Sequence, residues 1–279
     1  MPDLRPLYPY AGGKRRYLEF ISPFIQHATH YVEPFFGGGA VFCYAFNLRL
    51  SERYIINDIR EDIVSVYQSI KRNHFRVAAE FEDLRKKFMS LSIGDMENMF
   101  YEMRDKWEKS RGTALKLMLL NTSYGGLYQV DRAGVFNTNS GHMRFTRGRA
   151  IALDGEQICA WGDALQFTDI YSGDYRKVNV PVDSLVFCDP PYLDVGFAYD
   201  MPFSESDQRA CFNWCQQSSA TGDSTVIMTN NDSRGYFTNL CAGKRIRIIR
   251  YPANYSAGEN TSGEEIAMIW NERKSAHLL

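Results

Sequence analysis

The chain has 279 residues, of which 44% are hydrophobic and 14% aromatic, and its formal net charge is −1. This composition supports a buried core, and the length fits one large domain or two modest ones. It argues against a membrane or secreted protein, because no apolar run approaches the roughly 20 residues of a membrane span and residues 1–5 lack the pattern of a signal peptide. We expect a cytoplasmic protein.

The first 58 residues alternate between helical and extended patterns. The segment from Leu18 to Ile25 has helical spacing, and the segment from His30 to Phe35 is extended and ends in glycines. The segment from Arg53 to Asp58 reads as a short buried strand, after which helical spacing resumes. The pattern predicts a βαβ opening, with Asp58 at the end of its second strand.

The middle of the chain is helical and basic. The periodicity from Ile59 to Thr122 predicts helices, and the glycine-punctuated residues 123–149 predict a β-hairpin and an exposed loop. Residues 71–149 hold 15 of the 32 Lys and Arg but 9 of the 33 Asp and Glu, a net of +6 against −7 elsewhere. Phosphate contacts supply much of the affinity for nucleic acid, so this segment suits a DNA-facing module. A solvated basic helix surface explains the charge equally well.

Strand patterns return after Ile151. They cover residues 184–189, 224–230, 245–251 and 265–270, and two of them are continuous apolar runs of the kind buried in a parallel sheet. The fold class is therefore α/β, a doubly wound domain with a helical insertion that ends in a hairpin. We expect residues 1–58 and 150–279 to form the first domain and residues 59–149 the insertion.

The cysteines predict no metal and no disulfide framework. All six are scattered and none forms a CxxC pair: Cys43, Cys159, Cys188, Cys211, Cys215 and Cys241. Cys211 and Cys215 are four residues apart, which predicts one face of a helix rather than half of a metal site.

A glycine loop follows the first predicted strand. Gly37, Gly38 and Gly39 allow a tight turn and bring bare backbone against a ligand at the end of the strand. Asp58 closes the second strand 21 residues after Gly37, near the offset of about 20 residues at which an acid receives ribose hydroxyls in nucleotide-binding folds. Taken alone, the glycines also fit a simple tight turn, and Asp58 a helix N-cap.

The segment Asp189-Pro190-Pro191-Tyr192 ends an apolar strand and is more specific. An adenine amine is a poor nucleophile because its lone pair is delocalised into the ring, so a catalyst should hold its N–H groups with acceptors. Asp189 can supply one acceptor and the Pro190 carbonyl another, and Tyr192 offers a face on which a flipped base can stack. Such activation by position needs no metal and no covalent intermediate. The alternative is a proline-rich turn without chemistry.

In their order along the chain, these motifs resemble those of the Dam-type DNA adenine methyltransferases, of the N6-adenine alpha group. Residues 10–14 are similar to the AGGK motif of that family, residues 33–39 to its cofactor loop, residues 57–59 to its ribose-binding acid and residues 189–192 to its DPPY box. Residues 120–127 resemble the segment that opens the DNA-reading hairpin, residues 161–163 the region that meets the cofactor's adenine, and residues 262–265 the closing loop. The resemblance implies a Rossmann-like mixed sheet with a helical target-recognition insertion that bears a β-hairpin.

The resemblance also implies a cofactor, a partner and the site residues. The cofactor is S-adenosylmethionine, contacted by Tyr10, Ala11, Gly12, Lys14, Glu33, Pro34, Phe35, Gly37, Gly39, Asp58, Ile59, Asp163 and Ala164. The partner is double-stranded DNA, contacted by Asn121, Ser123, Tyr124, Gly126, Leu127, Gln129, Asn137, Arg144 and Arg147. The catalytic residues are Asp189, Pro190 and Tyr192. By itself Lys14 could instead be a solvated surface charge and Tyr10 a core residue, just as each arginine could belong to a solvated loop.

Two positions depart from the family. Relatives that read GATC have a lysine directly before the AGGK aromatic residue and an arginine two residues after the hairpin leucine, both suited to guanine. This chain has Pro9 and Gln129 there. Proline donates no hydrogen bond and glutamine favours adenine. We therefore expect a target other than GATC, or GATC with relaxed flanks.

The sequence thus predicts transfer of a methyl group from S-adenosylmethionine to N6 of a flipped adenine in duplex DNA, in a bacterial or phage-infected cell and near the nucleoid. The alternatives within the chemistry are RNA adenine, DNA cytosine or a protein glutamine as acceptor. A DNA-binding protein without activity is a rival from another class, and the intact glycine loop and DPPY box argue against it. A nicotinamide-dependent oxidoreductase would explain the glycine loop and Asp58 but not the DPPY box.

Overall fold

The computed structural model describes residues 3–10, 13–126, 129–131, 135–147, 149–192, 203–255 and 261–272. The chain divides into two compact units. The first unit is made of Met1–Gly13, Gly37–Asn47 and Arg60–Ile170, and the second of Lys14–Phe36, Leu48–Ile59 and Tyr171–Leu279. The boundaries after residues 58 and 149 separate the domain predicted to bind the cofactor from the insertion predicted to contact DNA, and they stay a prediction. Within the described residues, no helix has the length and apolar character needed to cross a membrane.

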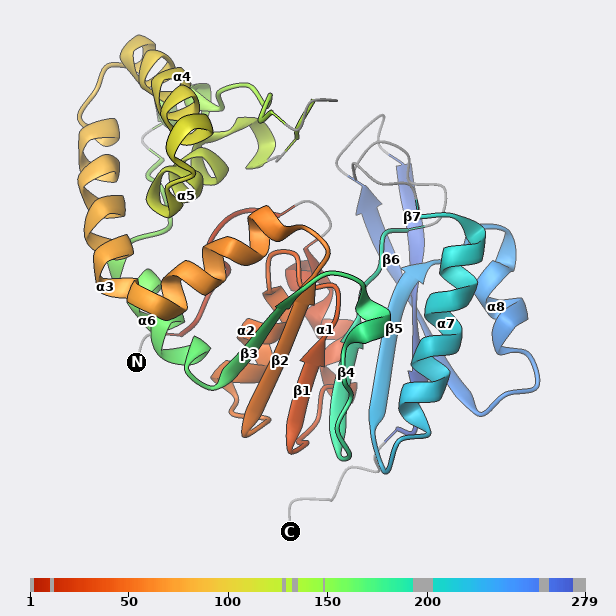
Figure 1. The fold of residues 1–279 in the computed structure, drawn as a ribbon. Coiled ribbons are helices and arrows are strands. Elements are labelled where there is room, and N and C mark those ends of the chain that lie inside the picture. The colour runs from red at the N-terminus through yellow and green to blue at the C-terminus, as the bar shows by residue number, and fades with distance from the viewer. Residues whose placement is uncertain are drawn as a thin grey trace. The chain divides into compact units, whose positions relative to one another are not determined.

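A mixed sheet organises the second unit, and its seven strands follow the order β3-β2-β1-β4-β5-β7-β6 (Figure 1). The strands are β1 (His30–Glu33), β2 (Arg53–Asp58), β3 (Thr168–Ser172), β4 (Ser184–Cys188), β5 (Thr225–Asn231), β6 (Ile246–Tyr255) and β7 (Thr261–Trp270). Strands β2, β1, β4 and β5 pair in parallel, whereas β7 is antiparallel to both β5 and β6. The boundary between the units falls within β3. The predicted Rossmann-like mixed sheet is confirmed.

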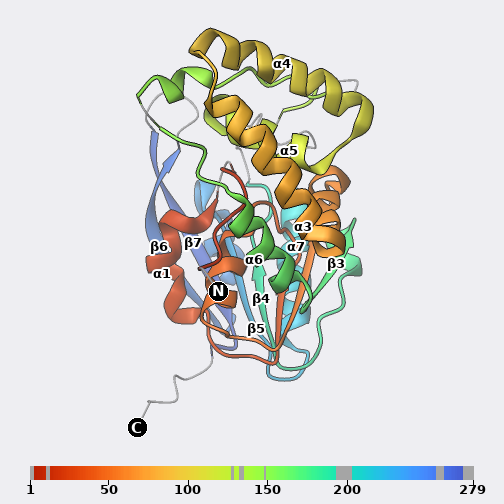
Figure 2. The ribbon, with the colours of Figure 1, turned by 90° about the vertical axis from the view of Figure 1, so that its left-hand side faces the viewer.

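The helices of the second unit cover both faces of its sheet. Helices α7 (Glu205–Ser219) and α8 (Tyr236–Cys241) lie on one face, and α1 (Leu18–Ile21) lies on the other, between the 3-10 turns η1 (Lys14–Tyr17) and η2 (Ser22–Phe24) (Figure 2). Ser204 caps the N-terminus of α7, where its side chain and that of Asp207 form a capping box. In place of the single helix predicted over residues 18–25, the structure has the short helix α1 followed by the 3-10 turn η2.

Cys211 and Cys215 lie on the buried face of α7, so the helix face predicted for them is confirmed. Their sulfur atoms and that of Cys188 lie within 4.8 Å of one another. The three belong to an apolar core with Val226, Met228 and Phe212. Burial raises the pKa of the Cys188 and Cys211 thiols, whereas at Cys215 the effect of burial is outweighed by hydrogen bonds with these two thiols, which lower its pKa to about 6. The predicted absence of a metal stays a prediction.

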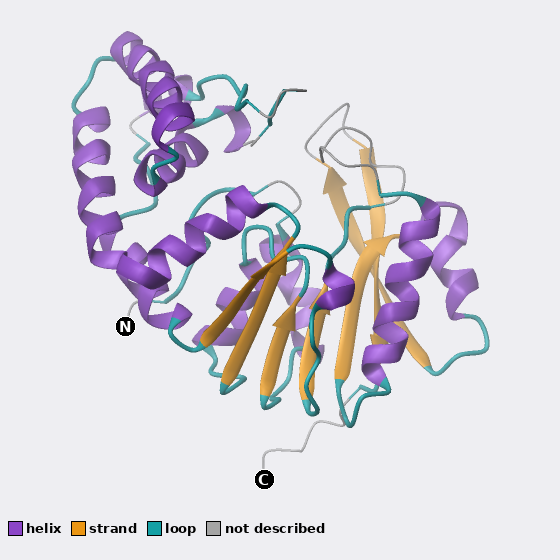
Figure 3. Cartoon of the chain, in the orientation of Figure 1, coloured by secondary structure: helices purple, strands orange, loops and turns teal. Residues whose placement is uncertain are grey.

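Helices make up most of the first unit. They are α2 (Ala40–Asn47), α3 (Glu61–Met89), α4 (Ile93–Ser110), α5 (Thr113–Thr122) and α6 (Gly155–Leu165), with short 3-10 turns η3 (Tyr124–Gly126) and η4 (His142–Arg147). Helix α3 packs on α5 and α6, and α4 packs on α5. Asn73 has non-helical backbone angles and kinks α3. Residues 61–122 are helical with short connections, as predicted (Figure 3).

The predicted hairpin follows α5. Two antiparallel bridges join its arms, between Ser123 and Ser140 and between Val130 and Phe136. The buried ring of Phe136 packs against Trp107 of α4, and the Phe136 amide donates to the Glu108 carboxylate at 2.9 Å. The hairpin is thereby fixed to α4 through one face of its second arm.

Candidate active site

The carboxyl ends of the parallel strands place several predicted residues along one edge of the sheet. Glu33 ends β1, Asp58 ends β2, and Asp189 directly follows β4. Parallel strands present their carboxyl ends at a common edge, where open α/β sheets bind their ligands. The sheet therefore explains why these three acids, far apart in sequence, can serve one site.

The Asp189 carboxylate is held by two side chains of the second unit. Lys14 lies with Nζ 2.8 Å from Asp189 Oδ2, and the Thr229 hydroxyl donates to Asp189 Oδ1 at 2.7 Å. The Lys14 side chain is 4% exposed and that of Asp189 is 20% exposed. A carboxylate has about four acceptor positions, so Asp189 can accept a further hydrogen bond from a ligand while both of these contacts persist.

Tyr192 is fixed at its hydroxyl and on its ring. Its hydroxyl donates to Glu265 Oε2 at 2.7 Å, and Lys14 Nζ lies 4.7 Å from the ring centroid. Tyr251 donates to the same Glu265 oxygen at 3.2 Å. Burial raises the pKa of the Glu265 carboxyl, which the Lys14 charge and the two phenols oppose. Lys14 thus contacts the carboxylate of the DPPY box and its aromatic ring together.

The two prolines of the DPPY box are held differently. Pro190 is buried. The Pro191 carbonyl accepts a hydrogen bond from Gln208 Nε2 at 2.6 Å, and the Gln208 carbonyl accepts one from Asn230 Nδ2 at 3.1 Å. Gln208 is fully buried on α7, and Asn230 follows Thr229 on β5. The predicted role of the Pro190 carbonyl as a second acceptor stays a prediction, and the protein's own bond falls on the next carbonyl.

Four of these contact residues, Thr229, Asn230, Gln208 and Glu265, were absent from the predicted site. A usable signal existed for Glu265, which directly precedes the apolar run of residues 266–270 in β7 and is buried together with it. A carboxylate in such a strand must have partners, because burying an unpaired charge is costly. Thr229 and Asn230 likewise interrupt an apolar run at the end of β5.

Apart from Lys14, which lies in η1, the cofactor residues predicted in the second unit lie at the ends of β1 and β2. Glu33 is buried and accepts a hydrogen bond from the Tyr31 hydroxyl at 2.8 Å. The Pro34 carbonyl accepts one from Asn57 at 3.0 Å. The Phe35 ring packs against that of Tyr175, with 4.8 Å between centroids. Asp58 is largely buried, whereas the next residue, Ile59, is 56% exposed.

Tyr10, one of the cofactor residues predicted in the first unit, packs against the glycine loop of residues 37–39. A Cβ atom on Gly37, whose φ is +50°, would lie 2.8 Å from Tyr10 Cε1, and one on Gly38 would lie 2.7 Å from Tyr10 Cβ. Gly39 also has a positive φ, of 66°. The glycines are therefore required by Tyr10 as well as by the tight turn. Ala11 and Gly12 lie outside the described residues.

Asp163 and Ala164 lie near the end of α6, also in the first unit. Ala164 is fully buried and its carbonyl accepts a hydrogen bond from Thr168, while Asp163 is partly exposed. The ring of the neighbouring Trp161 is buried, stacks on Phe42 and donates to the Arg5 carbonyl at 2.7 Å. Of the two, Asp163 is better placed for the predicted cofactor contact.

The predicted DNA contacts in the first unit separate into buried and exposed groups. Asn121 is buried and donates to the Leu7 and Leu117 carbonyls at 2.9 Å, and Ser123 is buried as well. These two side chains support the hairpin base. The exposed group is made of Tyr124, Gln129 and Asn137.

Of the other predicted DNA residues, Gly126 lies within this hairpin, and Arg144 and Arg147 follow it along the chain. Gly126 is buried with a positive φ, and a Cβ there would lie 2.5 Å from Pro9 Cβ. Arg144 is partly buried, donates to the Asn121 carbonyl and lies over the Phe145 ring. Burial lowers the pKa of Arg144. Arg147 ends η4, and Leu127 lies outside the described residues.

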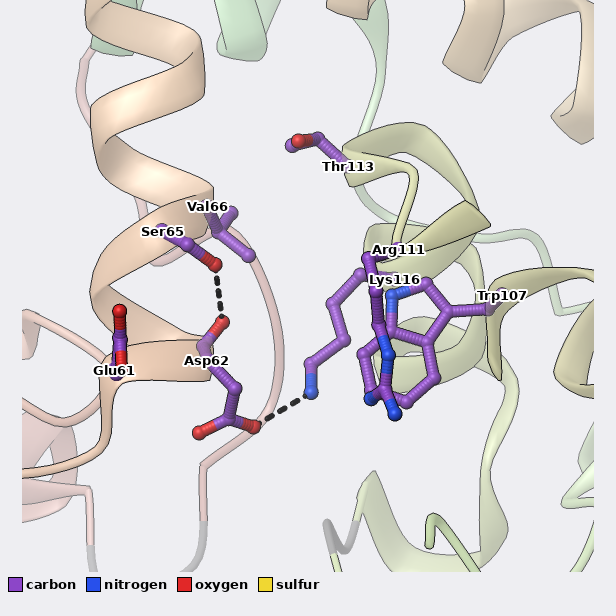
Figure 4. Close-up of a pocket in the computed structure, with 8 residues that line it drawn as sticks. All are labelled: Glu61, Asp62, Ser65, Val66, Trp107, Arg111, Thr113 and Lys116. Carbon is purple, nitrogen blue, oxygen red and sulfur yellow. Dashed lines mark hydrogen bonds and ion pairs between the residues drawn. The ribbon is translucent and has the colours of Figure 1, made fainter. Parts of the chain in front are cut away.

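A charged cluster in the first unit lines an open pocket of about 470 Å³ between α3, α4 and α5 (Figure 4). Lys116 points into it and binds Asp62 at 2.8 Å, with Nζ 4.3 Å from the Trp107 ring centroid. Arg111 also lies over this ring. Burial lowers the pKa of Lys116 from 10.5 to about 7, although Asp62 opposes the shift. The pair ties α5 to the start of α3.

Replacing Lys116 with methionine is expected to change how stability depends on pH. The unfolded lysine keeps its proton up to about pH 10.5, whereas the folded one releases it near pH 7. Between these values the unfolded state binds more protons, so the folded wild type gains stability as pH rises. Lys116→Met removes this gain, and denaturant unfolding at pH 6.5 and 9.5 measures it. Lys109→Met, at an exposed position of α4, is the control. If the free energy of unfolding changed equally between the two pH values in all three proteins, the lowered pKa of Lys116 would be contradicted.

The comparisons with known proteins agree with the motifs. A model of the D12 class N6 adenine-specific DNA methyltransferase family matches residues 10–255. The chain is 27% identical to the type II methyltransferase M.MjaIII of Methanocaldococcus jannaschii, over 88% of this chain and 91% of that protein. It is 25% identical to the type II methyltransferase M1.LlaDCHI of Lactococcus lactis subsp. cremoris, over 96% and 95%. The DNA adenine methylase of Escherichia coli K12 is 29% identical, over 69% and 66%. Because the family match spans most of the chain, the protein belongs to the D12 class N6 adenine-specific DNA methyltransferases.

Proposed function

We propose that the protein transfers a methyl group from S-adenosylmethionine to the exocyclic N6 amine of an adenine flipped out of duplex DNA. The carrying observation is the Asp189 carboxylate, fixed on one oxygen by Lys14 and on the other by Thr229. Tyr192 follows in the same box with its ring already oriented. This arrangement supplies an acceptor for an amine N–H and a flat surface for the base.

The transfer needs position more than acid–base power. N6 attacks the methyl carbon as the carbon–sulfur bond breaks, the displaced electron pair stays on sulfur, and N6 loses one proton. Asp189 directs the amine by accepting an N–H bond, and its carboxylate is a positioned acceptor for the departing proton. Tyr192 offsets part of the few kcal/mol that base flipping costs.

The residues of the second unit suit S-adenosylmethionine, which supplies a methyl group activated by its positive sulfur. The Glu33 and Asp58 carboxylates end adjacent parallel strands, where amine and ribose hydroxyl donors can be received. Ile59 exposes 56% of its surface beside Asp58, as an apolar contact for a ring would require. We assign the predicted cofactor role to these residues and to the glycine loop.

Gly37→Ala is expected to lower the affinity for S-adenosylmethionine at least roughly tenfold, because the added Cβ must displace Tyr10 and the backbone has a positive φ. Calorimetric titration measures the affinity, and thermal unfolding shows whether the fold persists. Gly94→Ala is the matched control, since a Cβ there meets nothing within 4 Å. Unchanged affinity in Gly37→Ala would remove the glycine loop from the cofactor site.

The target is proposed to differ from GATC, or to be GATC with relaxed flanks. Gln129 and Asn137 face each other across the hairpin, because the Asn137 amide donates to the Gln129 carbonyl at 3.0 Å beside the bridged pair Val130 and Phe136. Both are exposed. Carboxamides pair with adenine through its N6 and N7 atoms, so this pair favours A·T rather than G·C at the position it reads.

Methylome sequencing of DNA from cells that express the protein tests the target. The expected result is N6-methyladenine at a motif with an adenine at a position that Gln129→Ala relaxes. Methylation confined strictly to GATC would reject the proposal. Transfer of labelled methyl to duplex DNA, RNA and free protein separately tests the acceptor, because an RNA or protein preference would leave the chemistry intact and change the partner. Residence in the cytoplasm near the nucleoid stays a prediction.

A further inference from the structure

We propose that Glu265 is a positioning residue, which fixes the Tyr192 ring through its hydroxyl in the orientation that a flipped base requires. This inference rests on the proposed function and extends it to a residue outside the DPPY box. Glu265 Oε2 accepts the Tyr192 hydroxyl at 2.7 Å, and Glu265 itself is 3% exposed.

The strand pairing makes Glu265 a rigid support. Strand β7 lies between β5 and β6, and Glu265 pairs with Asn231 on one side and Tyr251 on the other. The Tyr251 hydroxyl reaches the same carboxylate oxygen, and its ring stacks on Phe20. A side chain on a central strand with a second, core-facing donor has little freedom to move. The carboxylate that accepts the Tyr192 hydroxyl is therefore held in place by the sheet.

The charge of Glu265 has a cost that the local contacts offset in part. Burying a carboxylate without partners is costly, and hydrogen bonds to a charged group are stronger than those between neutral groups. The two phenols supply such bonds, and the Lys14 charge favours the ionised form. An apolar residue would avoid this cost at a position chosen for stability alone. A charged residue is explained by the orientation it gives to Tyr192.

Two constraints together define the plane of the Tyr192 ring. The Glu265 bond holds the end of the ring, and Lys14 Nζ lies over one face, 4.7 Å from the centroid. A base must then stack on the opposite face. Without the hydrogen bond to Glu265, the ring would keep its contact with Lys14 but lose the contact that fixes its end. It would then sample orientations that do not support stacking.

Single-turnover methyl transfer to duplex DNA tests the inference with three variants: Glu265→Gln, Tyr192→Phe and the double variant. Each single change is expected to lower the rate roughly tenfold, as expected for one hydrogen bond to a charged group. The double variant is expected to be no slower than Tyr192→Phe, because Glu265→Gln weakens the same contact that Tyr192→Phe removes. Tyr236→Phe, which removes a phenol hydroxyl bonded to the Glu205 carbonyl, is the matched control at wild-type rate.

Two further readouts separate positioning from folding. The affinity for S-adenosylmethionine is expected to stay at the wild-type value, and fluorescence of 2-aminopurine at the target adenine is expected to change in Glu265→Gln and Tyr192→Phe but not in Tyr236→Phe. If Glu265→Gln fails to fold, Tyr192→Phe keeps the test. A wild-type rate in Tyr192→Phe, or losses that multiply in the double variant, would overturn the inference. A wild-type protein that does not methylate duplex DNA would instead reject the proposed function.

Discussion

Replacing Asp189 with alanine is expected to slow methyl transfer by roughly 10³-fold while the affinity for S-adenosylmethionine stays close to the wild-type value. In the proposed mechanism the carboxylate is the acceptor for the amine, so without it N6 would be neither oriented nor relieved of its proton. The carboxylates assigned to the cofactor are those of Glu33 and Asp58, which end other strands. Binding should therefore survive.

Single-turnover rates with saturating cofactor measure the Asp189→Ala effect, and calorimetric titration measures binding. Asp189→Asn is the matched variant, because it keeps the size and one oxygen of the side chain but loses the charge that pairs with Lys14. We expect it to lose most of the activity as well, since an amide oxygen is a weaker acceptor than a carboxylate. Loss of cofactor binding together with activity would show that Asp189 has a different role.

Lys14→Met is expected to reduce the rate of transfer by roughly 10²-fold, the second largest effect. The ammonium group lies 2.8 Å from Asp189 and over the Tyr192 ring, so its loss releases the acceptor and the stacking surface together. Its loss also leaves the Glu265 carboxylate without the cation that favours its charged form. Lys14→Arg should recover part of the rate, because charge returns in a different geometry.

The same experiment decides between two roles for Lys14. The motif resemblance predicts a contact with the cofactor, whereas the structure shows a contact with Asp189. A lower rate at saturating S-adenosylmethionine with unchanged affinity supports the positioning role. Weaker binding with an unchanged saturated rate would restore the cofactor role. Arg15→Met, at an exposed neighbouring position of η1, is the control for the loss of positive charge.

The parts of the fold that the sequence predicts are those with strong local patterns. The continuous apolar runs predict the buried strands β4 and β5, and helical periodicity predicts α3 to α5. Helices α6 and α8 and strand β3 were not predicted. Strand β3 mixes buried and exposed positions, and α8 has only six residues, so neither carries a long periodic signal.

The candidate site is predictable only in part, for a physical reason. The DPPY box and the glycine loop are contiguous in sequence, and their residue types carry the chemistry. The partners of the box come from elsewhere: Lys14 lies 175 positions before Asp189, and Glu265 lies 73 positions after Tyr192. Their contacts depend on the tertiary structure, in which β7 pairs between β5 and β6. No local pattern contains that pairing.

The two compact units carry different parts of the proposed function, and this affects how the protein can evolve. The described side chains found to hold the DPPY box, which are Lys14, Thr229, Gln208 and Glu265, belong to the second unit, and the candidate readers Pro9, Gln129 and Asn137 belong to the first. Substitutions in the hairpin can therefore drift toward new recognition sequences without altering the groups that activate the amine. Lineages that share this methylation chemistry could diversify their targets one hairpin residue at a time, and Gln129 is a candidate for such a change.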